Sequence, residues 1–112
     1  GMNILKASVD GTVAIVDGIQ LELPGNYRKI DDQVELGIRP EYISLSQTGG
    51  IQAETVSIDD VGKHIIVRCR LERQIVSVIV PEGTSIPDKP RLVFAQDKIN
   101  IYQNAVLVRP AD

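Results

Sequence analysis

The sequence has few of the residues that build disulfide frameworks, base-stacking platforms or membrane spans. Cys69 is the single cysteine among 112 residues, so an internal disulfide is excluded. Tryptophan is absent, and aromatic residues make up 4% of the chain, whereas proteins that stack single-stranded nucleic acid place aromatic side chains close together. No apolar run approaches the ~20 residues that a membrane-spanning helix requires. We therefore expect neither a disulfide scaffold nor a spanning helix in these residues.

An excess of positive charge is also lacking. The chain has 15 Asp and Glu residues against 12 Lys and Arg residues, which gives a net charge of −3. Nucleic-acid-binding domains usually carry a basic surface that neutralises phosphates, so we expect no nucleic-acid partner. A secretory signal is not expected either, because Lys6, Ser8 and Asp10 interrupt the first residues before an apolar segment can form. The lone cysteine fits a reducing compartment.

Residues that could perform chemistry are few and isolated. His64 is the single histidine and stands at the start of an expected strand, where we interpret it as a packing or turn residue. Cys69 falls on the inward face of that strand, where a buried thiol behaves as a small apolar side chain. One histidine and one cysteine are too few for a zinc site, and they do not form a nucleophile and base pair. We expect no metal site and no catalytic residues.

The sequence also lacks a complete phosphate-binding loop. Gly62-Lys63 resembles the end of one, but His64 follows where serine or threonine is required, and Ser57 stands where the first glycine belongs. Three arginines lie near one another and could bind an anion: Arg68, Arg70 and Arg73. We interpret them as a solvated strand face countered by Glu72. The chain by itself is therefore not expected to bind ATP or to be an enzyme.

What the chain does contain is a series of short runs in which apolar and polar residues alternate. Asp17-Gly18 lies between two such runs, 12–16 and 19–23, and predicts a hairpin with a type I′ turn. The other predicted strands are 5–9, 34–38, 42–45, 51–58, 64–73, 74–80, 92–95, 98–102 and 106–108. No stretch carries a helical apolar stripe over three turns. The pattern predicts an all-β fold built as small barrels or a sandwich.

Glycine and proline residues divide this series. Asp10-Gly11 predicts a further turn, and Pro24-Gly25-Asn26 is expected to end the hairpin. The segment 74–80 is nearly all apolar, as is typical of a strand that is covered on both faces. Gly49-Gly50 interrupts the pattern most strongly. We therefore predict two β subdomains, a first at 1–48 and a second at 49–112.

A segment near the middle of the chain resembles a known family. Residues 34–43, Val-Glu-Leu-Gly-Ile-Arg-Pro-Glu-Tyr-Ile, are similar to the "lGIRPEhi" signature in the C-terminal, transport-associated OB (TOBE) region of maltose-importer-type ABC ATPases. Further segments resemble landmarks of that region: Met2-Asn3-Ile4-Leu5, Val13 to Pro24, Val61-Gly62, Val78 to Pro81, Leu92-Val93-Phe94 and Lys98 to Tyr102. The sequence departs from the family at Tyr42, the usual histidine position, and at Leu71-Glu72-Arg73, which lacks a glycine turn.

The resemblance implies an all-β fold of OB-like small barrels (TOBE or MOP-like), in two β subdomains with little or no helix. It implies the regulatory and dimerisation domain of an ABC importer ATP-binding subunit, with sugar or glycerol phosphate as the family's commonest substrates. ATP and Mg²⁺ would bind the nucleotide-binding domain of the full-length subunit, an ATPase, and this chain would hold no cofactor. The implied partners are a second copy of the subunit, a cytoplasmic regulator and the membrane permease subunits. The implied location is the cytoplasmic face of the plasma membrane.

Arg39, Pro40 and Glu41, from the matched signature, are the candidate interface residues. Proline cannot donate to a strand ladder, so Pro40 predicts a corner. Two roles are open for the charges that flank it: contact with a partner, or an ion pair that locks the corner. An alternative function is an OB-like domain that senses a small ligand or oxyanion, which would need hydroxyl and amide donors converging on one pocket.

Overall fold

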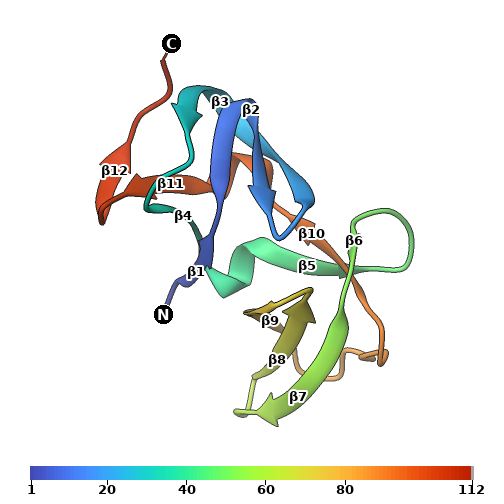
Figure 1. Cartoon of the computed structure of the whole chain (residues 1–112). Coiled ribbons are helices and arrows are strands. Elements are labelled where there is room, and N and C mark those ends of the chain that lie inside the picture. The colour runs from blue at the N-terminus through green and yellow to red at the C-terminus, as the bar shows by residue number, and fades with distance from the viewer. Residues whose placement is uncertain (112) are drawn as a thin grey trace.

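The computed structural model describes residues 1–111, and β-strands dominate it (Figure 1). The strands are β1 (Asn3–Lys6), β2 (Ser8–Val16), β3 (Ile19–Ile30), β4 (Val34–Ile38), β5 (Ile43–Ser46), β6 (Ile51–Gln52), β7 (Glu54–Asp60), β8 (His64–Leu71), β9 (Gln74–Pro81), β10 (Arg91–Phe94), β11 (Asn100–Gln103) and β12 (Val106–Val108). Two single-turn 3-10 helices, η1 (Pro40–Tyr42) and η2 (Gln96–Lys98), are the helical elements of residues 1–111. The predicted all-β, OB-like fold with little or no helix is confirmed. None of the described helices is long and apolar enough to span a membrane.

Within the described residues the strands form four small antiparallel sheets. Their strand orders are β1-β4-β11-β12, β5-β10-β6, β2-β3 and β7-β8-β9. Two sheets therefore join early and late strands: β4 lies between β1 and β11, and β10 pairs with both β5 and β6. These sheets combine strands from both sides of Gly49-Gly50. The division into units 1–48 and 49–112 stays a prediction, and any such units would share sheets.

The first hairpin turns where the sequence predicts and is longer than expected. Asp17 and Gly18 have φ values of 49° and 84°, as a type I′ turn requires. The predicted turn at Asp10-Gly11 is wrong, because β2 continues through it, with Gly11 at a φ of 66° opposite places where β3 carries extra residues. The predicted end at 24–26 is also wrong. The register changes there from Val13↔Glu22 to Gly11↔Tyr27, so these residues bulge from the ladder and β3 continues.

The sheet of β7, β8 and β9 has one buried face. Along β8 the residues alternate as predicted, with Val67 and Cys69 buried and Arg68 exposed. In β9 alternate residues are buried, including Val76, but Ile75 is 45% exposed. The prediction that this strand is covered on both faces is therefore wrong. β9 is an edge strand of a three-stranded sheet, and apolar composition alone does not reveal which face of an edge strand lies against solvent.

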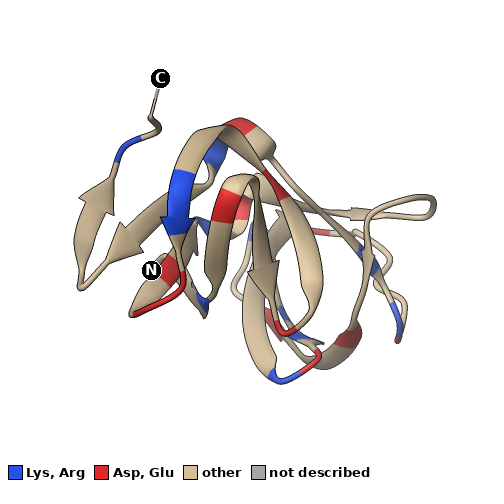
Figure 2. Cartoon of the chain, turned by 45° about the horizontal axis from the view of Figure 1, so that its top comes forward, with Lys and Arg blue, Asp and Glu red and all other residues tan. Residues whose placement is uncertain are grey.

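One apolar core joins the four sheets. Buried side chains from all of them form a single cluster, with fully buried members such as Leu5, Leu36, Val67 and Leu92. Among the described residues, Asn3 is the one buried polar or charged residue. The molecule is elongated, with extents of 41 × 23 × 22 Å. Acidic and basic residues are interspersed along the ribbon in the view of Figure 2.

Candidate functional site

The candidate site is the corner between β4 and β5, which we call the Arg39–Tyr42 corner. Arg39 is extended, with φ of −73° and ψ of 147°, and Pro40 begins η1. Proline suits this first helical position because its φ is already fixed and the position needs no N–H donor. The Tyr42 N–H closes the turn by donating to the Arg39 carbonyl at 3.0 Å. β5 then begins at Ile43, one residue after the predicted start.

The corner is anchored by its apolar residues and presents its charges to solvent. Pro40 is buried and η1 packs against β9, while Ile38 and Ile43 are buried on either side. Arg39 and Glu41 are both exposed. In the part of the chain that the structure describes, the recorded ion pair joins Arg70 and Glu54 at 3.1 Å, so Arg39 and Glu41 do not lock the corner by pairing. Their role as interface residues stays a prediction.

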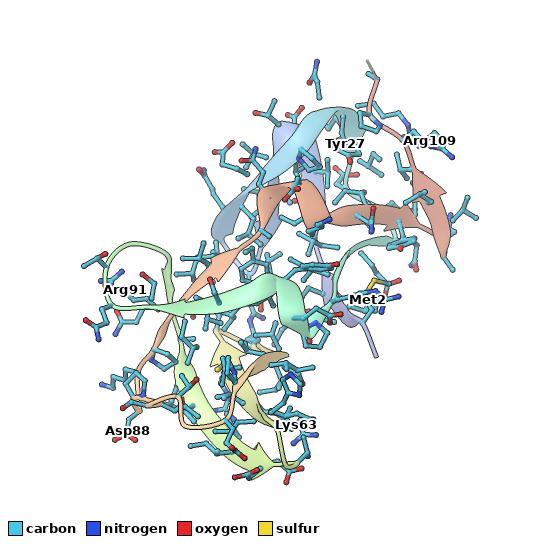
Figure 3. The ribbon with its side chains drawn as sticks, turned by 180° about the vertical axis from the view of Figure 1, so that it is seen from behind. Met2, Tyr27, Lys63, Asp88, Arg91 and Arg109 are labelled. Carbon is cyan, nitrogen blue, oxygen red and sulfur yellow. The ribbon has the colours of Figure 1, made fainter. Side chains whose placement is uncertain are left out.

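Gly37, which precedes the corner in β4, is needed for close packing rather than for an unusual φ. A Cβ atom there would lie 2.8 Å from Cε2 of Tyr102 and 3.0 Å from the sulfur of Met2. These two side chains come from opposite ends of the chain and lie over the outer face of β4; Met2 is labelled in Figure 3. The glycine thus lets the Tyr102 ring approach the backbone of β4 closely beside the corner.

A second contact holds the other end of the corner. The Lys98 ammonium lies 5.0 Å from the centroid of the Tyr42 ring, within the range of a cation–π interaction. The Ala95 N–H also donates to the Tyr42 carbonyl at 2.9 Å. η2 is therefore tied to η1. Sequence reasoning missed this contact because the two residues are far apart in the chain and no local pattern links them.

His64 and Cys69, the residues considered for catalysis and metal binding, lie apart from the corner in the β7-β8-β9 sheet. The His64 side chain is exposed, and its carbonyl accepts a hydrogen bond from Val61 N–H that closes the β7–β8 turn at 3.0 Å. Cys69 is fully buried, which confirms its place in the core. Burial raises the pKa of the Cys69 thiol, and a hydrogen bond with Thr55 partly offsets this rise. Residues 1–111 contain no group of three or more His, Cys, Asp or Glu side chains arranged to hold a metal ion.

The surface cleft that is richest in hydroxyl residues gives little support to an oxyanion site. One cleft of about 430 Å³ includes three hydroxyl residues in its lining, Ser46, Thr84 and Ser85. Two of these hydroxyls are already used, because Ser46 donates to the Thr48 carbonyl and Thr84 donates to the Pro81 carbonyl. Arg68, Arg70 and Arg73 are not in its lining. Convergent free donors, which an oxyanion would need, are not assembled in this cleft.

The comparison with known families identifies the central part of the chain. A family model described as "TOBE domain" matches residues 36–93, from β4 to β10. This range holds the Arg39–Tyr42 corner and the whole β7-β8-β9 sheet, and it covers just over half of the chain. No match is found among curated proteins.

Proposed function

The chain belongs to the TOBE domain family, and we propose that it is the regulatory and dimerisation domain of an ABC importer's ATP-binding subunit. TOBE domains occur in regulatory and molybdate-binding contexts in ABC transporters and are not catalytic. The observation that carries the proposal is the Arg39–Tyr42 corner, where exposed charges flank a buried proline. A fixed turn with charges in solvent suits recognition of a protein surface, since binding does not have to order it first.

The partners proposed for this corner are those that the family resemblance implies. In the full-length subunit a second copy would present the same corner, and a cytoplasmic regulator or the permease subunits would contact the same assembly at the inner face of the plasma membrane. ATP and Mg²⁺ would be held by the nucleotide-binding domain. Sugar or glycerol phosphate would be the transported substrate. A chain of 112 residues can offer only a modest interface, and an interface below about 1,200 Å² is typically weak or transient. The isolated chain is therefore expected to dimerise weakly.

The corner charges are tested by measuring self-association of the full chain. We expect Arg39→Ala and Glu41→Ala each to weaken dimerisation about five- to tenfold, as for loss of a moderate interface contact. Neither should change the free energy of unfolding by more than about 0.5 kcal/mol, because both side chains are exposed surface groups. Sedimentation equilibrium gives the first quantity and urea denaturation gives the second.

Matched controls are available elsewhere on the surface. Arg91 and Glu22 are also exposed, in β10 and β3, and Arg91→Ala and Glu22→Ala should leave dimerisation unchanged. If the control variants weaken the dimer as much as the corner variants, general charge effects and not the corner govern association. If the corner variants lose stability instead, the charges serve the fold of the corner.

The oxyanion-sensing alternative predicts a different result. Sulfate or molybdate would then raise the melting temperature of the chain and would act on the cleft that contains Ser46, Thr84 and Ser85. The hydroxyls of Ser46 and Thr84 already donate to backbone carbonyls, which makes this alternative less favourable. A thermal melt with and without millimolar oxyanion separates the two functions.

A further inference from the structure

Two strand edges meet in this fold without forming a ladder. β1 belongs to the β1-β4-β11-β12 sheet and β9 belongs to the β7-β8-β9 sheet, and the two strands lie in contact. Asn3 in β1 bridges this gap with its side-chain amide. Its Oδ1 accepts the Ser77 N–H at 2.8 Å, and its Nδ2 donates to the Ser77 carbonyl at 2.9 Å. One carboxamide thus satisfies both backbone groups of one β9 residue.

The reverse arrangement is present nearby. The Oε1 of Gln74 in β9 accepts the Lys6 N–H of β1 at 2.8 Å, and its Nε2 donates to the Lys6 carbonyl at 3.1 Å. Each strand therefore supplies one amide side chain and one backbone residue. The Asp17 carboxylate, from the turn of the first hairpin, accepts the Arg73 N–H at 3.2 Å and lies 3.4 Å from the Gln74 Nε2. This carboxylate helps to orient Gln74 toward β1.

These four hydrogen bonds can fix the alignment of β9 along β1, which apolar packing alone does not. Burial of apolar side chains is non-directional, so the valine and leucine faces of the two sheets do not by themselves fix how far β9 slides along β1. A side-chain carboxamide has the same donor and acceptor as a peptide group, and each pair can form in only one register. Asn3 is also the one buried polar residue among those described, and leaving its amide unpaired would cost free energy. A slipped register is therefore penalised.

We propose that Asn3 and Gln74 form a latch between β1 and β9, that the latch fixes the register of the two sheets, and that it opens as one unit while both ladders stay closed. η1 packs on β9, and Asn3 also pairs with Ile38, the residue before Arg39, so the latch lies beside the Arg39–Tyr42 corner. The inference rests on the hydrogen-bond geometry and is independent of the proposed transport function.

Hydrogen exchange measures the latch directly, because the Ser77 and Lys6 N–H groups donate to the Asn3 and Gln74 side chains. The variants are Asn3→Ala and Gln74→Ala. If the latch opens as a unit, each single variant raises the exchange rate of both amides by about tenfold, the order expected for loss of a hydrogen bond. The amide of Val67, in the centre of the β7-β8-β9 sheet, should keep its protection.

The controls and the contrary outcomes are defined by the same experiment. Asn100→Ala and Gln20→Ala remove amides from exposed positions in β11 and β3, and both should leave the Ser77 and Lys6 rates unchanged. If each latch variant affects only the amide that it touches, the two bridges are independent and the proposal is wrong. A rise shared by Val67 would also overturn it, since the ladders would then open with the latch. Gln74 is only half-buried, so Gln74→Ala carries the test even if Asn3→Ala does not fold.

Discussion

At the scale of single residues, Gly37 makes the most specific packing prediction. Gly37→Ala would place a methyl group 2.8 Å from the Tyr102 ring and 3.0 Å from the Met2 sulfur. Both side chains are partly exposed and can move outward, so the cost should be that of moderate overpacking, about 1–2 kcal/mol of unfolding free energy. Urea denaturation of the wild type and the variant gives this difference.

A double-mutant cycle assigns the cost to its cause. In a Tyr102→Ala background the ring is absent, and Gly37→Ala should then cost less than half as much. An equal cost in both backgrounds would mean that the backbone of β4, and not the Tyr102 ring, requires glycine.

At the scale of elements, the turn between β11 and β12 is strained. Asn104 and Ala105 have φ values of 51° and 64°, as in a type I′ turn. The second position of a type I′ turn usually holds glycine. Ala105→Gly should relieve the steric conflict of a left-handed alanine and stabilise the chain by about 0.5–1 kcal/mol. Thermal denaturation measures the gain. The matched variant Ala95→Gly, at a φ of −65°, should destabilise the chain, and stabilisation by both would contradict the explanation.

The elements also divide into those that local sequence predicts and those that it does not. The alternation of Val67, Arg68 and Cys69 predicts β8 and its inward face. Asp17-Gly18 predicts the turn between β2 and β3. Both predictions succeed because strand faces and type I′ turns are local properties. Asp10-Gly11 predicts a turn because Gly11 does adopt the left-handed conformation that turns use, but the strand continues through it.

Contacts between distant segments were not predictable in the same way. The pairing of Asn3 with Ser77 and the approach of Lys98 to Tyr42 each join residues more than 50 positions apart. Nothing in the local pattern distinguishes these side chains from the other amides and lysines of the chain. The candidate residues Arg39, Pro40 and Glu41 came from the family signature, and the structure adds that the proline is buried and the charges are exposed.

At the scale of the whole molecule, the fold places the Arg39–Tyr42 corner where three sheets meet. η1 packs on β9, and the Tyr42 carbonyl accepts a hydrogen bond from the N–H of Ala95, just before η2. Other apolar groups are exposed elsewhere, including Val106 and Leu107 on β12, at 66% and 45%. This apolar surface of β12 is a second candidate site of self-association, besides the Arg39–Tyr42 corner. The family assignment and the exposed charges favour the corner.

The central claim, that the Arg39–Tyr42 corner is the docking surface, is tested most directly by ¹H–¹⁵N NMR spectra of the wild-type chain at increasing concentration. Between about 10 μM and 1 mM, the range over which a small, weak interface should fill, we predict progressive shifts of the Arg39, Glu41 and Tyr42 amides. The amides of β12 should not shift. Spectra that stay unchanged to 1 mM, or shifts confined to Val106 and Leu107, would contradict the claim.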